Sequence, residues 1–334
     1  MCCLLGLVDV KHTLTGNEKK RIVYALAVAG EARGTDATGI AYNSGGKLII
    51  EKQPIPAHRM RIRIPQDAFV ITGHTRMATH GNARRGRNNH PFLGQVPDMQ
   101  FALSHNGVLS NDRNLRMTHK LPCTKIETDS YVAVQLIEAE RTLDVGSVRH
   151  MAELLKGTFN FTILDRNNRL YIVKGNNPLC IYHFKEKGFI AYASTKAILE
   201  EALEDAYVLK LSHEEIKIGD GEILINDPDG SITRSYFKPP ASCHIYSYPL
   251  YDTWIPKEEE PTGYQKFMMD YAQSIGVPRA ELDYLHNMGF SDGDLELCIY
   301  DREYRVMCLF DSGYYDEMED TFYADAYFKD FPRT

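Results

Sequence analysis

The stretch MCCLLGLVDV (residues 1–10) combines a cysteine at position 2 with an apolar run of strand length, so that LLGLVDV predicts a buried strand. Cys2 is small enough for removal of the initiator methionine, which would leave a terminal residue with both a thiol and a free α-amine. An α-amine has a reference pKa of about 7.7–8.0 and can therefore act as a general base near neutral pH. Taken alone, however, a cysteine at this position is more often a small buried residue than a nucleophile.

Strand and helix patterns alternate outward from this first strand to about residue 237. The spacing of apolar residues predicts helices over residues 18–32, 130–143 and 195–204. Runs rich in β-branched and aromatic residues predict a hairpin over 39–52 and strands over 67–75, 100–106, 157–165, 169–175, 180–184 and 189–194. Because the strands come in two runs with helices between them, the pattern favours an α+β layered fold over a doubly wound parallel sheet.

The composition changes after residue 237. Residues 238–262 are rich in Pro, Tyr and Glu and indicate a linker, whereas residues 263–334 predict an acidic, mainly helical C-terminal extension. Helices are expected there over 262–276, 279–290 and 292–310. From residue 238 onward, 8 Lys and Arg stand against 19 Asp and Glu; this net charge of −11 leaves +4 for residues 1–237, given the chain total of −7. Such a tail is typical of a solvated acidic surface or, alternatively, of a docking surface for a basic partner, and it disfavours direct nucleic-acid binding by the tail.

The overall composition is that of an ordinary globular chain, with 43% hydrophobic and 25% charged residues. No window approaches the roughly 18 apolar residues of a membrane span, and the N-terminus lacks the basic region of a signal peptide. The seven cysteines include no CxxC pair, and no metal-ligand spacing emerges. We therefore expect a cytoplasmic protein with free thiols, no membrane segment, no metal site and no cofactor, and the oligomeric state is left open.

Five motifs follow Cys2 in order and change the interpretation of that residue. They are RGTDATGIAY at 33–42, GHTRMATHG at 73–81, NNHPF at 88–92, SHNGVLSN at 104–111 and ETDSYVAVQLIE at 127–138. Together with the N-terminal Met-Cys and with GTFNFTILD at 157–165, the series resembles the class II glutamine amidotransferases, which are N-terminal-nucleophile hydrolases. The resemblance implies a glutaminase domain over residues 2–237. It also implies an αββα sandwich of two antiparallel sheets flanked by helices.

The resemblance assigns the main roles, and each role has a physical reason. Cys2 is implied as the nucleophile, while the Asn106 amide and the Gly107 N–H are implied as the oxyanion hole that a tetrahedral intermediate needs. Arg76 would hold the glutamine carboxylate through a bidentate fork, and Asp129 would accept the α-ammonium group. The structural alternatives are an Asn-Gly hairpin turn at 106–107, an ion pair for Arg76 and a helix N-cap for Asp129.

Four further residues match positions of the same motifs. Thr79 and His80 are expected to line the glutamine pocket, Arg33 to shape the site, and His90 to contribute to it, although each could instead brace a loop. The chain also departs from the family pattern. Cys3 stands where Gly is common, and Thr35 and Ala37 replace the more usual Pro and Ser of their loop.

The expected reaction is hydrolysis of glutamine to glutamate and ammonia through a γ-glutamyl thioester on Cys2. The ammonia acceptor is not predicted, because residues 238–334 are too short for the synthase domains of most relatives. A separate synthase subunit is one partner that this gap suggests. The first alternative is hydrolysis of other γ-glutamyl amides or peptides, and the second is a non-catalytic interaction protein that retains the fold.

Overall fold

The computed structural model describes residues 2–78, 81–238, 271–287, 290, 292–300 and 302–311. The chain divides into two compact units, residues 1–248 and residues 249–334, and each is described by itself. Apart from residue 238, the predicted linker over 238–262 lies outside the described residues, and so does most of the predicted helix over 262–276.

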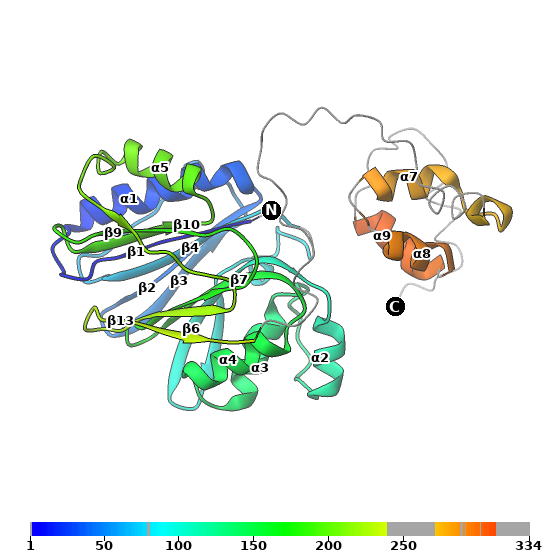
Figure 1. Ribbon diagram of the computed structural model, residues 1–334, viewed down its shortest axis with the longest axis horizontal. Coiled ribbons are helices and arrows are strands. Elements are labelled where there is room, and N and C mark those ends of the chain that lie inside the picture. The colour runs from blue at the N-terminus through cyan, green and yellow to red at the C-terminus, as the bar shows by residue number, and fades with distance from the viewer. Residues whose placement is uncertain are drawn as a thin grey trace. The chain divides into compact units, whose positions relative to one another are not determined.

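The first unit contains two antiparallel sheets that lie face to face (Figure 1). Within the described residues the first sheet has seven strands in the order β11-β9-β10-β1-β4-β2-β3. Their bounds are β1 Cys3–Val8, β2 Ala37–Ser44, β3 Lys47–Gln53, β4 Val70–Arg76, β9 Cys180–Phe184, β10 Phe189–Ala193 and β11 Glu214–Glu215. The stretch that opens the sequence thus forms a central strand, with β10 on one side and β4 on the other.

The second sheet has six strands in the order β13-β12-β8-β7-β6-β5 among the described residues. Their bounds are β5 Phe92–Val96, β6 Met99–Leu109, β7 Gly157–Asp165, β8 Leu170–Lys174, β12 Glu222–Asn226 and β13 Ile232–Tyr236. The eleven-residue strand β6 pairs with β7 from Phe101 opposite Asp165 to Leu109 opposite Gly157.

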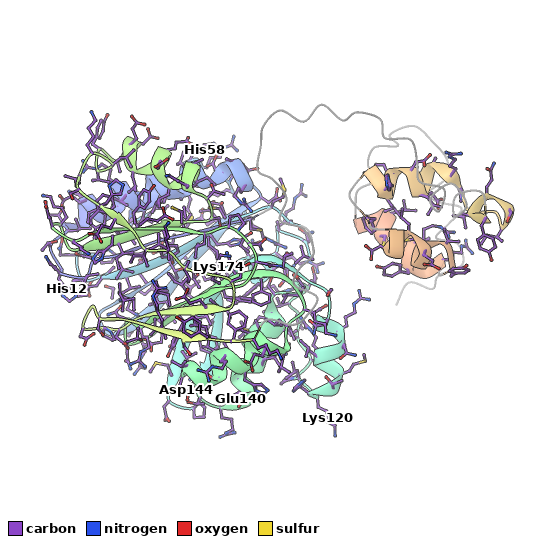
Figure 2. All side chains as sticks on the ribbon, viewed as in Figure 1. His12, His58, Lys120, Glu140, Asp144 and Lys174 are labelled. Atoms are coloured by element: carbon purple, nitrogen blue, oxygen red, sulfur yellow. The ribbon has the colours of Figure 1, made fainter. Side chains whose placement is uncertain are left out.

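Helices cover the outer faces of both sheets and complete the αββα sandwich (Figure 1). Helices α1 (Gly16–Ala29) and α5 (Lys196–Asp205) pack on the first sheet; α3 (Tyr131–Glu140) and α4 (Val145–Leu154) pack on the second. A third apolar cluster, which includes Val8, Leu164 and Tyr192, fills the space between the sheets. Side chains occupy each of these layers, and Glu140 and Asp144 mark the short connection between α3 and α4 (Figure 2). This architecture confirms the predicted α+β sandwich.

Hydroxyl groups also join the two sheets inside this layer. The Thr72 hydroxyl on β4 lies 2.9 Å from the Thr162 hydroxyl on β7, and the Tyr192 hydroxyl on β10 donates to Thr72 over 3.0 Å. All three residues are buried. Because a buried hydroxyl without a partner is costly, these contacts favour one alignment of the sheets.

Helix bounds differ from the sequence predictions at a few places. Thr15 and Glu18 form a capping box, so α1 begins at Gly16, and the helix gives way at Gly30 to the 3-10 helix η1 (Gly30–Arg33) rather than continuing to residue 32. Gly30 lies against Cys3 and Thr75, which leaves little room for a side chain at that turn. Two helices, α2 (Asp112–Thr118) and α4, were not predicted from the sequence.

In the described part of the second unit, helices α7 (Arg279–Asn287), α8 (Asp292–Tyr300) and α9 (Arg302–Asp311) surround an apolar cluster, and residues 271–274 are also helical. The single helix predicted over 292–310 is therefore wrong, because α8 and α9 are separate. The buried Arg305 guanidinium joins α9 to the other two helices, since it donates to Glu281 on α7 over 3.0 Å and to the Cys298 carbonyl on α8 over 2.7 Å. Among the described helices of both units, none combines the length and apolarity that a membrane crossing requires.

Candidate active site

Cys2 lies immediately before β1, at the edge where β1 and β4 begin to pair with Cys3 opposite Thr75. Its side chain is half-buried, and the sulfur lies 3.4 Å from the Met77 carbonyl oxygen. Arg33, the last residue of η1, donates from Nε to the Cys2 carbonyl over 2.8 Å. The backbone of Cys2 is therefore held by the strand on one side and by η1 on the other.

Cys3 points to the opposite face of the strand, as alternation along a strand requires. It is fully buried in the core beneath α1, and a Cβ atom placed on Gly30 would come within 3.4 Å of its sulfur. Burial raises the pKa of Cys3, which keeps its thiol protonated. The second cysteine fills a core position in place of the usual Gly, and only Cys2 faces the site.

The thiol of Cys2 is not activated by its surroundings alone. Burial raises its pKa, whereas the Met77 contact and the charge of Arg76 act in the lowering direction and offset part of that shift. A neutral thiol needs a general base before it can attack a carboxamide. The free α-amine that removal of Met1 would create is the base that lies within the same residue.

Arg76 ends β4 and lies within electrostatic reach of Cys2. It is buried, and its guanidinium donates to the Asn89 side-chain oxygen over 2.6 Å and to the Gly81 carbonyl over 3.1 Å. Burial lowers the pKa of Arg76, and nearby carboxylates, including Asp36 and Asp129, oppose that effect. Two fixed contacts orient the planar group, as a bidentate carboxylate site requires.

Asp129 lies just before α3 and also acts on Cys2 electrostatically. Its Oδ2 accepts a hydrogen bond from the Leu109 backbone N–H at 2.7 Å, and its Oδ1 accepts one from the Ser130 hydroxyl at 3.3 Å. Ser130, not Asp129, occupies the N-cap position of α3, and it makes no side-chain cap bond. The helix-cap alternative for Asp129 is therefore not what the structure shows.

Asn106 and Gly107 lie inside strand β6, so they do not form a hairpin turn. Gly107 has φ +148°, and a Cβ atom at this position would lie 1.9 Å from the Thr158 carbonyl oxygen. No other residue fits there without displacing β7. The strand thus combines a buried amide side chain with a glycine whose backbone packs closely against β7.

Ser194 connects Asn106 to the strand of the nucleophile, and sequence reasoning missed it. Its hydroxyl oxygen accepts from the Leu4 backbone N–H over 2.8 Å and from the Asn106 amide over 3.3 Å. Asn177 adds a second support, since its amide donates to the Asn106 carbonyl over 2.8 Å. Asn160, within the GTFNFTILD motif, holds the loop of Asn177 by donating to the Asn177 carbonyl over 2.8 Å. The motif was a signal for Asn160, whereas none of the motifs contains Ser194.

His90 takes part in a buried cluster of three histidines beneath the site. Its ring centroid lies 4.3 Å from that of His74 and 6.4 Å from that of His105. Burial lowers the pKa of all three, and the pKa of His74 falls to about 3. Neither ring nitrogen of His90 has a hydrogen-bond partner among the described residues. From the NNHPF motif it is Asn89, rather than His90, that contacts Arg76 directly.

The RGTDATG loop lies against the end of β4. The Asp36 carboxylate accepts from the Ala78 backbone N–H over 2.7 Å, and a Cβ atom on Gly34 would lie 2.3 Å from the Arg76 carbonyl carbon. The Thr35 and Ala37 replacements leave Arg33 in contact with Cys2. Thr79 and His80, which were predicted to line the pocket, lie outside the described residues. Within the described ranges, no three His, Cys, Asp or Glu side chains are arranged to hold a metal ion.

Known proteins resemble the chain in sequence and in fold. A family model for a glutamine amidotransferase domain matches residues 74–201. The isomerizing glutamine–fructose-6-phosphate aminotransferase of Listeria monocytogenes is 30% identical over 294 residues, which cover 83% of this chain and 46% of the relative. The corresponding protein of Bacillus licheniformis is 29% identical over 290 residues, with coverages of 83% and 46%.

A solved structure supports the fold. Glutamine phosphoribosylpyrophosphate amidotransferase from B. subtilis aligns with a TM-score of 0.56 and 21% identity, covering 71% of this chain and 49% of that one. At this identity the likeness concerns the fold alone. The chain spans about half the length of the curated relatives it matches.

Proposed function

The chain contains a class II glutamine amidotransferase domain, and from this premise we propose that Cys2, once Met1 is removed, hydrolyses the side-chain amide of glutamine. The observation that carries the proposal is the charge pattern around the thiol. A buried cation, Arg76, and a buried carboxylate, Asp129, both act on Cys2. Glutamine carries one carboxylate and one ammonium group at the end opposite its amide, so this pair complements both charges of the substrate.

The chemistry follows from the arrangement of donors and base. The α-amine of Cys2 takes the thiol proton, and the sulfur attacks the amide carbon of glutamine. The Asn106 amide and the Gly107 N–H stabilise the resulting oxyanion. The protonated α-amine of Cys2 then gives this proton to the leaving nitrogen of the substrate amide. The C–N bond breaks, ammonia departs and a γ-glutamyl thioester remains on Cys2. The amine next removes a proton from water, which attacks the thioester and releases glutamate with the thiol restored.

The ammonia is passed, in this proposal, to an acceptor site outside the matched domain, on a partner synthase. Support comes from the relatives, whose names describe transfer of the glutamine nitrogen to fructose 6-phosphate or to phosphoribosylpyrophosphate. The domain found here corresponds to about half of those proteins. A pull-down with the full chain that recovers a synthase would identify the acceptor.

Two matched variants test the nucleophile. Cys2→Ala is expected to abolish glutamate release from glutamine, whereas Cys3→Ala should retain it, because the Cys3 side chain faces the core. Mass spectrometry should show a chain without Met1 and one adduct of 6-diazo-5-oxo-norleucine, located at Cys2. Normal turnover by the Cys2→Ala variant, or full activity of a chain that keeps Met1, would overturn the mechanism. A non-catalytic protein that only retains the fold would give no adduct at Cys2.

The amide substrate is tested by parallel assays with glutamine and with γ-glutamyl peptides. Both substrates present the free α-amino and α-carboxylate groups that Asp129 and Arg76 would bind, and they differ only in the leaving amine. Faster turnover of glutamine is expected, because the proposed transfer to a synthase requires that the leaving group be ammonia. A preference for γ-glutamyl peptides would instead assign the site to γ-glutamyl hydrolysis.

A further inference from the structure

A row of exposed arginines follows η2 (Ala57–Arg59) on the side of the first unit covered by α1. The sequence HRMRIRI at 58–64 alternates basic and apolar residues in extended backbone after Arg59. Arg59 and Arg61 are exposed, whereas Met60 and Ile62 are buried in the core beneath α1. Alternation therefore places guanidinium groups above an apolar floor.

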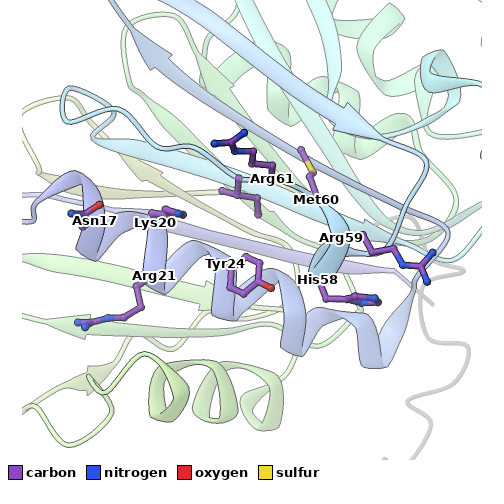
Figure 3. Close-up of a pocket in the computed structure, with 9 residues that line it drawn as sticks. Asn17, Lys20, Arg21, Tyr24, His58, Arg59, Met60 and Arg61 are labelled. Atoms are coloured by element: carbon purple, nitrogen blue, oxygen red, sulfur yellow. The ribbon is translucent and has the colours of Figure 1, made fainter.

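Helix α1 supplies the facing wall. Asn17, Lys20, Arg21 and Tyr24 follow one another at helical spacing, so they share a face of the helix, and all four are exposed. These side chains and residues 58–62 line a cavity of about 540 Å³, called here the basic pocket (Figure 3). Lys20 and Tyr24 extend from α1 toward the segment that carries Arg59 and Arg61 (Figure 3). The volume falls within the roughly 300–1,000 Å³ range of small-molecule sites.

The charges of this pocket have few counterparts in the protein. Within the part of the chain that the structure describes, Lys20, Arg59 and Arg61 make no ion pair with a carboxylate within 4.0 Å. His58 is held by Glu31, with Nδ1 3.0 Å from the carboxylate. Arg21 contributes to the lowered pKa of Glu18, so its charge is partly countered. Lys20, Arg59 and Arg61 line one concave surface. Positive charge on such a surface attracts an anion, and guanidinium groups match phosphate oxygens in geometry.

Tyr24 adds a feature that a bare phosphate does not need. Its ring is 39% exposed at the pocket, where it offers a platform for stacking against a planar ring. The Asn17 amide carries both donors and an acceptor for the edge of such a ring. We propose that the basic pocket binds a small phosphorylated anion with an aromatic ring, of the nucleoside polyphosphate class, with the phosphates on Lys20, Arg59 and Arg61 and the ring on Tyr24.

The test is equilibrium binding to the full chain, with ATP and inorganic tripolyphosphate as probes in calorimetry. ATP should bind saturably and, because a stacked ring adds about 1–3 kcal/mol, at least about 5-fold more tightly than tripolyphosphate. Arg59→Glu/Arg61→Glu should weaken ATP binding by at least about 30-fold, since repulsion replaces attraction. Tyr24→Leu should remove the advantage of ATP over tripolyphosphate. The matched control Arg166→Glu/Lys210→Glu changes the same charge at exposed positions outside the pocket and should leave both affinities unchanged.

Several results would overturn the proposal. The first is the absence of saturable ATP binding, and the second is an equal loss of ATP affinity in the pocket variant and in the control. The third is equal affinity for ATP and tripolyphosphate. The fourth is tighter binding of a single-stranded oligonucleotide through the same arginines. The last outcome would assign the surface to nucleic acid. ATP binding is also measured on Cys2→Ala. An unchanged affinity for ATP in this variant would support a pocket that is independent of the proposed glutamine hydrolysis.

Discussion

The site around Cys2 and the basic pocket on α1 both depend on arginine, but they hold it in opposite ways. Arg76 is 3% exposed and fixed by Asn89 and Gly81. Arg59 and Arg61 are exposed above an apolar floor. In the two proposals, the buried guanidinium would recognise a ligand through geometry set before binding, whereas the exposed ones would act mainly through the density of positive charge.

This contrast has a consequence for how each region tolerates change. A buried, hydrogen-bonded group loses much when its shape or its neighbours change, because its partners are left unsatisfied. An exposed cation can be replaced by another cation at small cost, since water and side-chain motion accommodate the difference. The variants below test whether the two regions differ in this way.

The largest effect is expected for Gly107→Ala. The added methyl would lie 1.9 Å from the Thr158 carbonyl oxygen at φ +148°, so β6 must move away from β7 and carry the Asn106 amide with it. Glutaminase activity should fall at least about 1,000-fold, comparable to the loss of an oxyanion donor. Gly86→Ala is the matched control, because no atom lies within 4 Å of its added Cβ, and it should retain activity. Near-normal turnover by the Gly107 variant would contradict the role of this strand.

The buried histidines should make the first unit sensitive to acid. Burial lowers the pKa of His74, His90 and His105 in the folded state, whereas in the unfolded chain each titrates near 6.5. Below that value the unfolded state binds more protons, so the free energy of unfolding falls with decreasing pH, by up to about 1.4 kcal/mol per pH unit for each histidine and about 4 kcal/mol for three. Urea unfolding between pH 7 and pH 4.5 measures this slope.

Two variants identify the source of the acid sensitivity. His90→Phe keeps a ring against His74 and Phe92 and should reduce the slope by about a third. His119→Asn, at an exposed position outside this cluster, is the control and should leave the slope nearly unchanged. Equal slopes in the two variants would remove the buried cluster from the explanation.

Arg76→Lys tests the geometric side of the comparison directly. Lysine cannot keep the contacts to Asn89 and Gly81 and also present a planar fork, so kcat/KM for glutamine should fall about 100-fold, or about 3 kcal/mol. Arg59→Lys preserves an exposed charge and should change ATP affinity by less than about 3-fold. A reversal of this order, with tolerance at Arg76 and loss at Arg59, would show that the two regions do not differ as described.

The smallest effect is expected for Ser130→Ala. The Ser130 hydroxyl joins His105 Nδ1, at 2.8 Å, to the Asp129 carboxylate, at 3.3 Å, and so acts through Asp129 as a positioning residue. Its loss should raise KM for glutamine about 3- to 10-fold, consistent with one hydrogen bond of about 1 kcal/mol, and leave kcat nearly unchanged. Ser130→Thr keeps the hydroxyl and should restore KM. A drop in kcat with constant KM would place the effect elsewhere.

The sequence predicted the layered fold, because alternation along strands and spacing along helices are local signals. Asn106, Gly107, Arg76 and Asp129 were assigned from the resemblance of ordered motifs to a known family, and their roles stay predictions. Ser194 was not, since its role depends on a contact with Leu4, 190 residues away in the chain. The contact of Asn89 with Arg76, 13 residues away, was also not predicted, because it depends on how the NNHPF motif packs against β4. The separation of α8 from α9 was also not predicted, and the contacts of the buried Arg305 with α7 and α8 are known only once the helices have packed.

The two halves of the candidate site belong to different sheets. Cys2 and Arg76 lie at the end of the first sheet, while Asn106 and Gly107 lie in the second. The Thr72–Thr162 contact and the Tyr192 hydroxyl are polar contacts in an otherwise apolar layer, and they favour one alignment of the two sheets. A slip of one residue along a strand, about 3.3 Å, would carry the proposed oxyanion donors out of register with the sulfur even if every strand stayed paired. Under the proposed mechanism, activity would depend on how the two sheets are aligned, so a chain in which both sheets are intact could still be inactive.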